Sequence, residues 1–172
     1  LDFSRYVRAS TRMSGDFLDY FEIDKTHVGF YLADVSGHGV SSAFVTVMLK
    51  SFMNRCQDRF QEGADEMILQ PEQILTGLNN ELRLQNLGKH LTFFYGVVDT
   101  ASNTMLYASA GQFPFPVLFS GGEIDVLQAK GTPLGLFDFS KYSSTEMTLP
   151  ASFAMAGFSD GILEVLPPRH LK

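Results

Sequence analysis

The sequence of 172 residues predicts a single domain of the α+β class, and three observations support this class. Its predicted strands stand next to other strands and its two long predicted helices follow one another, an order typical of α+β folds and unlike a repeated βαβ unit. Hydrophobic residues make up 45% of the chain, enough to fill the core of one domain of this length. Turn signals separate about eight short apolar segments. We therefore expect one domain over residues 1–172, without an internal boundary.

The first third of the chain predicts an antiparallel hairpin followed by a helix. Residues 17–23 and 28–35 are rich in aromatic and branched side chains, and the polar turn between them is too short for a parallel return. Ser36-Gly37-His38-Gly39 then breaks the second strand. From residue 40 to about 54 apolar residues recur at helical spacing and surround the helix almost completely. We expect that helix to be buried on more than one face.

The remaining two thirds predict one more helix and three strand pairs. Residues 57–70 are polar and irregular, and Pro71 then opens a helix that continues to residue 84. Short polar turns separate the strands that follow, so each pair is expected to be antiparallel. The pairs are 91–98 with 105–110, 117–119 with 124–127, and 145–149 with 153–158.

Charge and composition exclude several classes of partner. The chain has 13 Lys and Arg against 19 Asp and Glu, a formal net charge of −6, and no basic cluster that could neutralise nucleic-acid phosphates. Its apolar runs are too short for a membrane-spanning helix, and the first ten residues do not resemble a signal peptide. The one cysteine, Cys56, fits a reducing compartment. We expect a cytoplasmic protein that binds neither nucleic acid nor membrane.

Three acidic residues stand at predicted strand ends beside glycines. They are Asp16 after Gly15, Asp34 shortly before Gly37, and Asp160 before Gly161. Taken singly, an aspartate next to a glycine is also ordinary turn chemistry. Brought together at one edge, three carboxylates repel one another unless a cation lies between them. Oxygen ligands without His or Cys suit hard ions such as Mg²⁺ or Mn²⁺, so the pattern indicates a metal site.

A second interpretation of the glycine-rich loop is a dinucleotide site. Gly37-x-Gly39-x-x-Ser42 follows a strand and opens a helix, and Asp58 lies at the spacing of a ribose ligand. That fingerprint requires a parallel βαβ unit, whereas the strand here belongs to a tight antiparallel hairpin. The carboxylate of Asp34 would also repel a pyrophosphate, so the metal interpretation is favoured.

The segment Gly157-Phe158-Ser159-Asp160-Gly161 matches the G-x-S-x-G pattern of a serine hydrolase. In that fold an acid and a histidine follow the serine in the chain and come from separate loops. The acid and histidine that follow Ser159 are too close to it in sequence to do so. A serine hydrolase is therefore disfavoured.

Six motifs follow one another in a fixed order from Ser14 to Gly161, over nearly the whole chain. The motifs are Ser14-Gly15-Asp16-Phe17-Leu18-Asp19, Asp34-Val35-Ser36-Gly37-His38-Gly39-Val40, Leu91-Thr92-Phe93-Phe94-Tyr95-Gly96-Val97-Val98-Asp99, Ala110-Gly111-Gln112-Phe113-Pro114, Gly131-Thr132-Pro133-Leu134-Gly135-Leu136 and Phe158-Ser159-Asp160-Gly161. In this order they resemble those of the bacterial phosphatases related to the sporulation stage II protein E, the bacterial branch of the type 2C metal-dependent Ser/Thr phosphatases.

The resemblance implies an αββα four-layer sandwich of two mostly antiparallel sheets flanked by helices, with two Mn²⁺ or Mg²⁺ ions at one end. It implies that Asp34 bridges both ions, that the Val35 carbonyl binds one of them, and that Asp16 and Asp160 complete the site. No side chain would act as nucleophile, because a water activated by both ions attacks phosphorus. The loop expected to face the substrate contains Ser36, Gly37 and His38.

The sequence also departs from the family pattern. Ser14 replaces the first glycine of the Gly-Gly-Asp-Phe motif, and Gln112 stands where a histidine usually follows Ala-Gly. The family continues past Asp160 with a helix and a strand that carry a final Asp-Asp pair, and the sequence ends at Lys172 without them. We therefore expect the C-terminal helix and strand to be missing and the second metal site to lack a ligand. An uncovered sheet edge would favour self-association as a homodimer.

The resemblance implies a Ser/Thr phosphoprotein phosphatase that acts on a small regulator of the anti-anti-sigma type. It further implies that the domain belongs to a longer signalling protein with an N-terminal receiver or sensor domain. An alternative of a different class is a non-catalytic pseudophosphatase that binds such a regulator without hydrolysing it.

Overall fold

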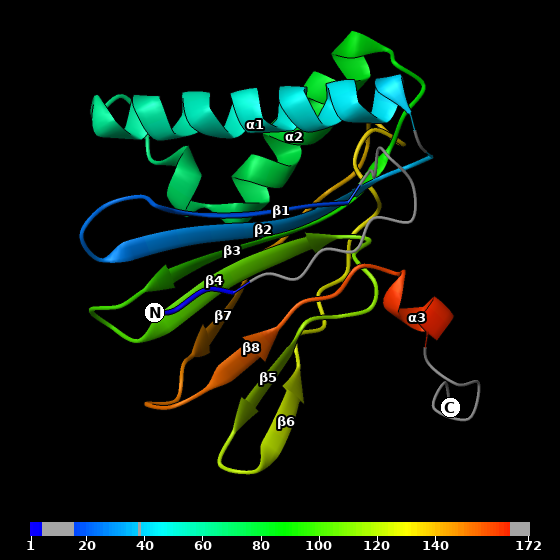
Figure 1. Ribbon diagram of the computed structural model, residues 1–172. Helices are drawn as coiled ribbons and strands as arrows, with labels where there is room; N and C mark the ends of the chain where they lie inside the picture. The colour runs from blue at the N-terminus through cyan, green and yellow to red at the C-terminus, as the bar shows by residue number, and fades with distance from the viewer. Residues whose placement is uncertain (5–15, 38, 166–172) are drawn as a thin grey trace.

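The computed structural model describes residues 1–4, 16–37 and 39–165, and in these ranges the chain forms two antiparallel sheets and a few helices. This confirms the predicted α+β class. Helices α1 and α2 lie above the larger sheet, and the smaller sheet lies below it (Figure 1). The elements are β1 (Asp16–Glu22), β2 (His27–Val35), α1 (Val40–Gln61), η1 (Met67–Leu69), α2 (Pro71–Gln85), β3 (Leu91–Asp99), β4 (Thr104–Ala110), β5 (Val117–Ser120), β6 (Glu123–Val126), β7 (Thr145–Thr148), β8 (Ala154–Ala156) and α3 (Ile162–Val165).

The larger sheet has the strand order β1-β2-β3-β4-β7, and the smaller sheet has the order β6-β5-β8. Each pair of neighbouring strands is antiparallel. The predicted hairpin of β1 and β2 is confirmed, and its register sets Asp16 directly opposite Asp34. On the other side of β2, Asp34 lies opposite Thr92 of β3. Two of the three predicted aspartates, Asp16 and Asp34, thus lie side by side at one end of the larger sheet.

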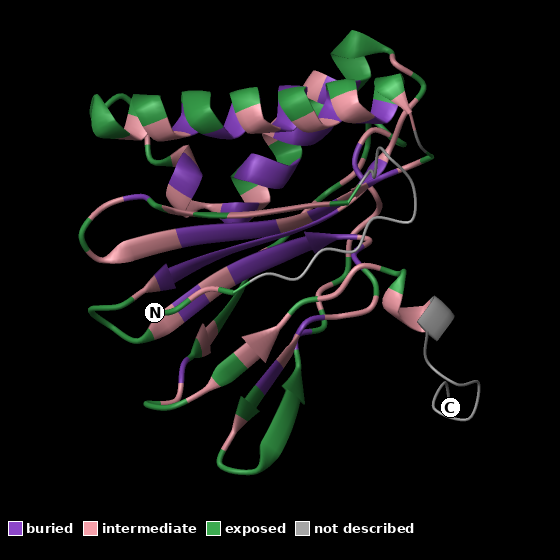
Figure 2. Cartoon of the chain, in the orientation of Figure 1, coloured by how far each residue is buried: buried purple, intermediate pink, exposed green. Residues whose placement is uncertain are grey.

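Alternating side chains of the larger sheet supply two cores. Tyr31 and Tyr95 belong to the core under the helices, where the Tyr95 hydroxyl donates to the Ile68 carbonyl at 2.7 Å. Phe30 and Phe94 point the other way, into the core between the two sheets. The central strands are buried almost throughout, whereas all four residues of β6 are exposed (Figure 2). The larger sheet therefore contributes side chains to both cores.

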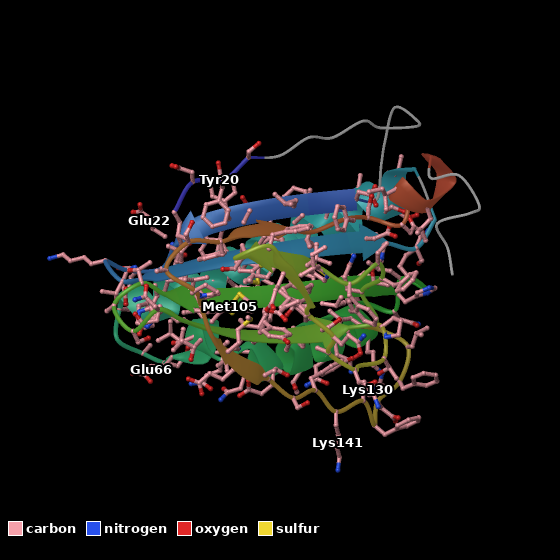
Figure 3. All side chains as sticks on the ribbon, turned by 90° about the horizontal axis from the view of Figure 1, so that it is seen from below. Tyr20, Glu22, Glu66, Met105, Lys130 and Lys141 are labelled. Atoms are coloured by element: carbon pink, nitrogen blue, oxygen red, sulfur yellow. The ribbon has the colours of Figure 1, made fainter. Side chains whose placement is uncertain are left out.

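Charged side chains surround these cores. Seen from below, Met105 lies near the middle of the molecule, and Lys141 projects outward at its edge (Figure 3). Met105 is fully buried in the core between the sheets.

Within the described ranges no helix is both long and apolar enough to cross a bilayer.

The last predicted strand pair is wrong. The strands predicted at 145–149 and 153–158 are β7 and β8, but they lie in different sheets: β7 pairs with β4 and β8 pairs with β5. Each strand completes a sheet edge that its predecessors leave open, since β4 otherwise pairs only with β3 and β5 only with β6. The hydrogen bond from Leu149 N to the Asn103 carbonyl, at 2.7 Å, extends the alignment of the chain with the larger sheet.

Helix α1 differs from the prediction in its length and burial. It continues to Gln61, because Cys56 is buried in the core and the side-chain amides of Gln57 and Gln61 donate to carbonyls of residues 22 and 23, at the end of β1. The expectation that it is buried on more than one face is wrong. Val40 and Val47 are 78% and 67% exposed, since α1 is the outermost layer and only one side of it meets the sheet.

Candidate metal centre

Two of the three predicted aspartates are brought together by the β1–β2 hairpin. Directly opposed residues of an antiparallel pair project their side chains on the same face, so the carboxylates of Asp16 and Asp34 point the same way. This face is the one that carries Phe30 and Leu32 toward the smaller sheet. The hairpin register therefore presents two carboxylates to whatever segment closes that end of the sheets.

The segment that closes this end follows β8 and carries Asp160. A Cβ built on Gly157 would lie 2.4 Å from Cδ1 of Leu32, so the absence of a side chain at Gly157 lets the segment approach β2 closely. Single carboxylate oxygens of Asp16, Asp34 and Asp160 lie within 4.8 Å of one another. In the described part of the chain, this is the one group of three or more potential metal ligands. Asp16 and Asp160 are exposed and Asp34 is half-buried, so the cluster opens to the surface.

The electrostatics of this cluster are strained without a cation. Burial contributes most to raising the pKa of Asp34 to about 6, and the charges of Asp16 and Asp160 and a hydrogen bond with Asp16 supply the rest of that rise. A divalent cation relieves this repulsion, and carboxylate oxygens without nitrogen or sulfur donors are the ligands that Mg²⁺ and Mn²⁺ prefer. The residues present thus fit the ions that the sequence predicts.

The loop after Asp34 is the one expected to supply a carbonyl ligand and a substrate-facing surface. The Ser36 N–H donates to the His90 carbonyl at 2.9 Å, toward β3. Because successive residues of a strand direct their backbone groups to opposite sides, Val35 directs its carbonyl toward the β1 side of the sheet. Gly37 is exposed and has a φ of +77°, a conformation that favours glycine. His38 lies outside the described residues.

Two residues that the sequence does not single out brace this loop. The Lys89 ammonium donates to the Ser36 carbonyl at 2.9 Å, and the His90 N–H donates to Ser36 Oγ at 3.1 Å. Ser42, at the start of α1, also approaches the Ser36 carbonyl, with its Oγ at 3.4 Å. The only sequence signal for these contacts is Gly37 itself, whose missing side chain leaves room for the Lys89 ammonium.

The competing dinucleotide interpretation does not survive the topology. Strand β2, which precedes the glycine-rich loop, is antiparallel to both of its neighbours, β1 and β3. The βαβ unit with parallel strands that the fingerprint requires is therefore not formed around this loop.

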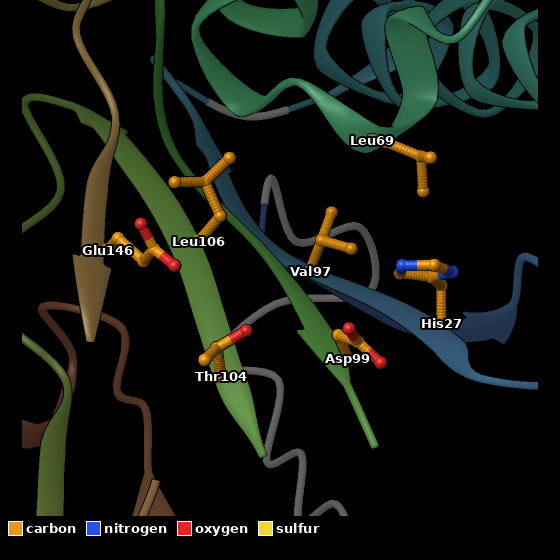
Figure 4. A pocket seen from close by; sticks show the side chains of 7 residues that line it. All are labelled: His27, Leu69, Val97, Asp99, Thr104, Leu106 and Glu146. Atoms are coloured by element: carbon orange, nitrogen blue, oxygen red, sulfur yellow. The ribbon is translucent and has the colours of Figure 1, made fainter. Parts of the chain in front are cut away.

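A separate hollow of about 240 Å³ lies where β2 begins, away from the carboxylates (Figure 4). Val97, Leu106 and Leu69 form its apolar part, and its polar lining comes from His27, Asp99, Thr104 and Glu146. His27 Nδ1 lies 2.9 Å from Asp24, and Asp99 accepts from the Ser102 hydroxyl at 2.7 Å. Among the described residues, the acidic and histidine side chains of this hollow do not form a group of three potential metal ligands as the aspartates do.

The family model of stage II sporulation protein E (SpoIIE) matches residues 24–170. The chain belongs to this family. The match covers most of the chain and includes two of the three clustered aspartates, and it confirms the resemblance carried by the six motifs.

Two curated relatives of this SpoIIE-family domain come from Bacillus subtilis. The chain is 27% identical over 164 residues to the phosphoserine phosphatase RsbP, covering 92% of this chain and 39% of RsbP. It is 29% identical over 167 residues to the phosphoserine phosphatase RsbU, covering 95% of this chain and 47% of RsbU. The chain thus spans less than half the length of these relatives.

Solved structures confirm the fold. A Mycobacterium tuberculosis structure of RsbU and RsbW domains superposes with a TM-score of 0.72 at 23% identity, covering 91% of this chain and 42% of that one. The PP2C phosphatase domain of Bacillus subtilis SpoIIE superposes with a TM-score of 0.71 at 19% identity, covering 94% and 45% of the two chains. RsbX, solved in complex with magnesium, superposes with a TM-score of 0.67 at 17% identity, covering 88% and 69%.

Proposed function

We propose that this domain is a metal-dependent phosphatase that removes phosphate from phosphoserine or phosphothreonine on a protein. The observation that carries the proposal is the cluster of Asp16, Asp34 and Asp160, three carboxylates on one open surface of a SpoIIE-family fold. Two curated relatives named phosphoserine phosphatases support it.

Each residue of the cluster has a role in this proposal. The charges of both Asp16 and Asp160 act on the Asp34 carboxylate. In this proposal Asp34 would bind both of two Mn²⁺ or Mg²⁺ ions, with the Val35 carbonyl as a further ligand. When bound, such ions activate water and offset the negative charge of a phosphoryl group. The chain's own contribution is to hold the ions with the hairpin and with the segment after β8. With three carboxylates in the described cluster, we propose that the second ion is held by fewer ligands.

The exposure of the site suits a substrate that is itself a folded protein. Asp16 and Asp160 are exposed, so a phosphorylated residue on a protein surface can reach them. The net charge of −6 provides no general attraction for a bare phosphopeptide. We propose a small regulator of the anti-anti-sigma type as substrate, and a receiver or sensor domain that acts with this domain in the cell.

Release of inorganic phosphate from a phosphoserine protein tests the proposal. We expect turnover with Mn²⁺ or Mg²⁺, none in excess chelator, and a loss of at least about 100-fold in Asp34→Asn. Asp125→Asn, on the exposed strand β6, is the matched control and should keep normal turnover. Full turnover in chelator with no metal retained would overturn the two-ion proposal. Tight binding of the phosphorylated regulator without turnover in any metal would favour the pseudophosphatase instead.

A further inference from the structure

Gln112 is a buried amide that joins two segments of the metal centre. It lies two residues after the end of β4 and is only 3% exposed. Its Nε2 donates to the Phe158 carbonyl at 2.9 Å, and its Oε1 accepts from the Thr92 hydroxyl at 3.2 Å. Both ends of the amide therefore have hydrogen-bond partners. Thr92 belongs to the larger sheet, and Phe158 follows the last strand of the smaller sheet.

The two partners of Gln112 lie next to the aspartates. Thr92 is the residue of β3 directly opposite Asp34 of β2, so their side chains share a face of the larger sheet. Phe158 precedes Asp160 by two residues, in the segment that follows β8 of the smaller sheet. A single side chain thus connects the neighbour of one carboxylate to the segment that carries another.

The orientation of the amide is fixed by chemistry. A backbone carbonyl only accepts hydrogen bonds, so the NH₂ group of Gln112 must face Phe158. Its oxygen then faces Thr92, whose hydroxyl can donate. Because Gln112 is buried, removal of its amide leaves the Phe158 carbonyl without this donor, and a buried acceptor without a partner destabilises the fold. The segment is expected to move rather than leave that carbonyl unpaired.

Asp160 depends on such a tie more than Asp34 does. Asp34 is held by ladder pairing on both sides, with β1 and with β3. Asp160 lies outside any strand, after the three-residue strand β8, and its own carbonyl accepts a local hydrogen bond from the N–H of Leu163 at 2.8 Å. The position of its carboxylate relative to Asp34 therefore rests on how the segment before it is anchored to the larger sheet.

We infer that Gln112 is a positioning residue that sets the spacing between the Asp160 and Asp34 carboxylates, and hence the affinity for a divalent cation. Its consequence for catalysis rests on the proposed function, whereas its effect on the position of Asp160 can be measured without a substrate. It also assigns a role to a position where the family usually carries histidine, since a neutral histidine likewise offers one donor and one acceptor.

The test compares Gln112→Met with a matched control at a second buried amide. Asn79 of α2 is 2% exposed and also bridges two backbone groups, accepting from Gly135 N at 2.8 Å and donating to the Phe137 carbonyl at 3.1 Å. It lies on the helix side of the larger sheet. Asn79→Leu should therefore lower stability about as much as Gln112→Met without touching the carboxylates.

Two measurements decide the inference. The first is Mn²⁺ affinity by calorimetry on metal-depleted protein, where we expect Gln112→Met to weaken binding about tenfold, Gln112→His to recover most of it, and Asn79→Leu to leave it unchanged. The second is amide hydrogen exchange in metal-free protein, where exchange of residues 157–163 should accelerate in Gln112→Met alone. If Gln112→Met does not fold, Thr92→Val removes the hydroxyl donor with little change of volume and should show the same effects at smaller size.

The outcomes separate this inference from the proposed function. Wild-type affinity and exchange in Gln112→Met would overturn the inference, as would equal effects in Asn79→Leu. If the wild-type protein binds no Mn²⁺, the proposed function fails and hydrogen exchange alone decides the role of Gln112. If affinity and exchange change as expected but no phosphoprotein is hydrolysed, the positioning role stands and the phosphatase proposal falls.

Discussion

Asp34→Asn should change the stability of this protein in opposite directions with and without metal. In the metal-free protein the carboxylate of Asp34 is half-buried beside those of Asp16 and Asp160, and its pKa is raised to about 6 from 3.8. A carboxyl group with a raised pKa in the folded state stabilises the fold while it is protonated and loses that contribution as pH rises from about 4 through about 6. Asparagine keeps the shape and cannot ionise.

The size of the effect follows from the shift. About two pKa units correspond to about 3 kcal/mol, which solvent screening around a half-buried group reduces to about 1–2 kcal/mol. For a domain of this length that is an increase of about 3–6 °C in Tm for metal-free Asp34→Asn at pH 7.5. With Mn²⁺ at about 100 times its Kd, the wild-type protein gains about 2.7 kcal/mol, and the variant should gain much less.

Thermal unfolding of metal-depleted protein at pH 4 and pH 7.5, with and without added Mn²⁺, gives the Tm of each variant under the four conditions. The advantage of Asp34→Asn should be present at pH 7.5 and absent at pH 4, where the wild-type carboxyl is protonated in the folded state. Asp125→Asn on β6 is the control and should follow the wild type throughout. A metal-free Asp34→Asn that is less stable than wild type at pH 7.5 would refute the claim that these carboxylates repel one another.

Two further predictions concern the segments that surround the carboxylates. Gly157→Ala should destabilise the protein by about 1 kcal/mol, because the new Cβ would meet the Leu32 side chain. In a double-mutant cycle measured by denaturant unfolding, Leu32→Ala should relieve part of that cost, and fully additive effects would contradict this contact. Lys89→Met should weaken Mn²⁺ binding, measured by calorimetry, about threefold because it releases the Ser36 carbonyl. Lys141→Met, at the outer edge of the molecule, is the control and should leave the affinity unchanged. Equal affinities in the two variants would contradict the bracing role of Lys89.

The exposed outer face of α1 shows what the apolar pattern of a sequence leaves open. Val40 and Val47 fit the same helical spacing as the buried residues, and the pattern predicts burial for all of them. Burial depends on how many layers lie around the helix, and in the described fold only the sheet side of α1 is covered. The extension of α1 past residue 54 has a similar origin. The side-chain amides at 57 and 61 donate hydrogen bonds to the carbonyls of residues 22 and 23 at the end of β1, and these contacts form only in the folded structure.

The sequence by itself determined the features that depend on neighbours in the chain. The short turn after residue 23 forces an antiparallel hairpin, and the hairpin register then sets Asp16 opposite Asp34. Tertiary structure alone decided which sheet edge each late strand completes, because β7 and β8 are adjacent in sequence yet join different sheets. It also decided the contacts of Gln112, since hydrogen bonds between segments 20 and 46 residues away leave no periodic signal along the chain. Local order arises from spacing and turns, whereas the anchoring of the aspartate cluster arises from where distant segments meet.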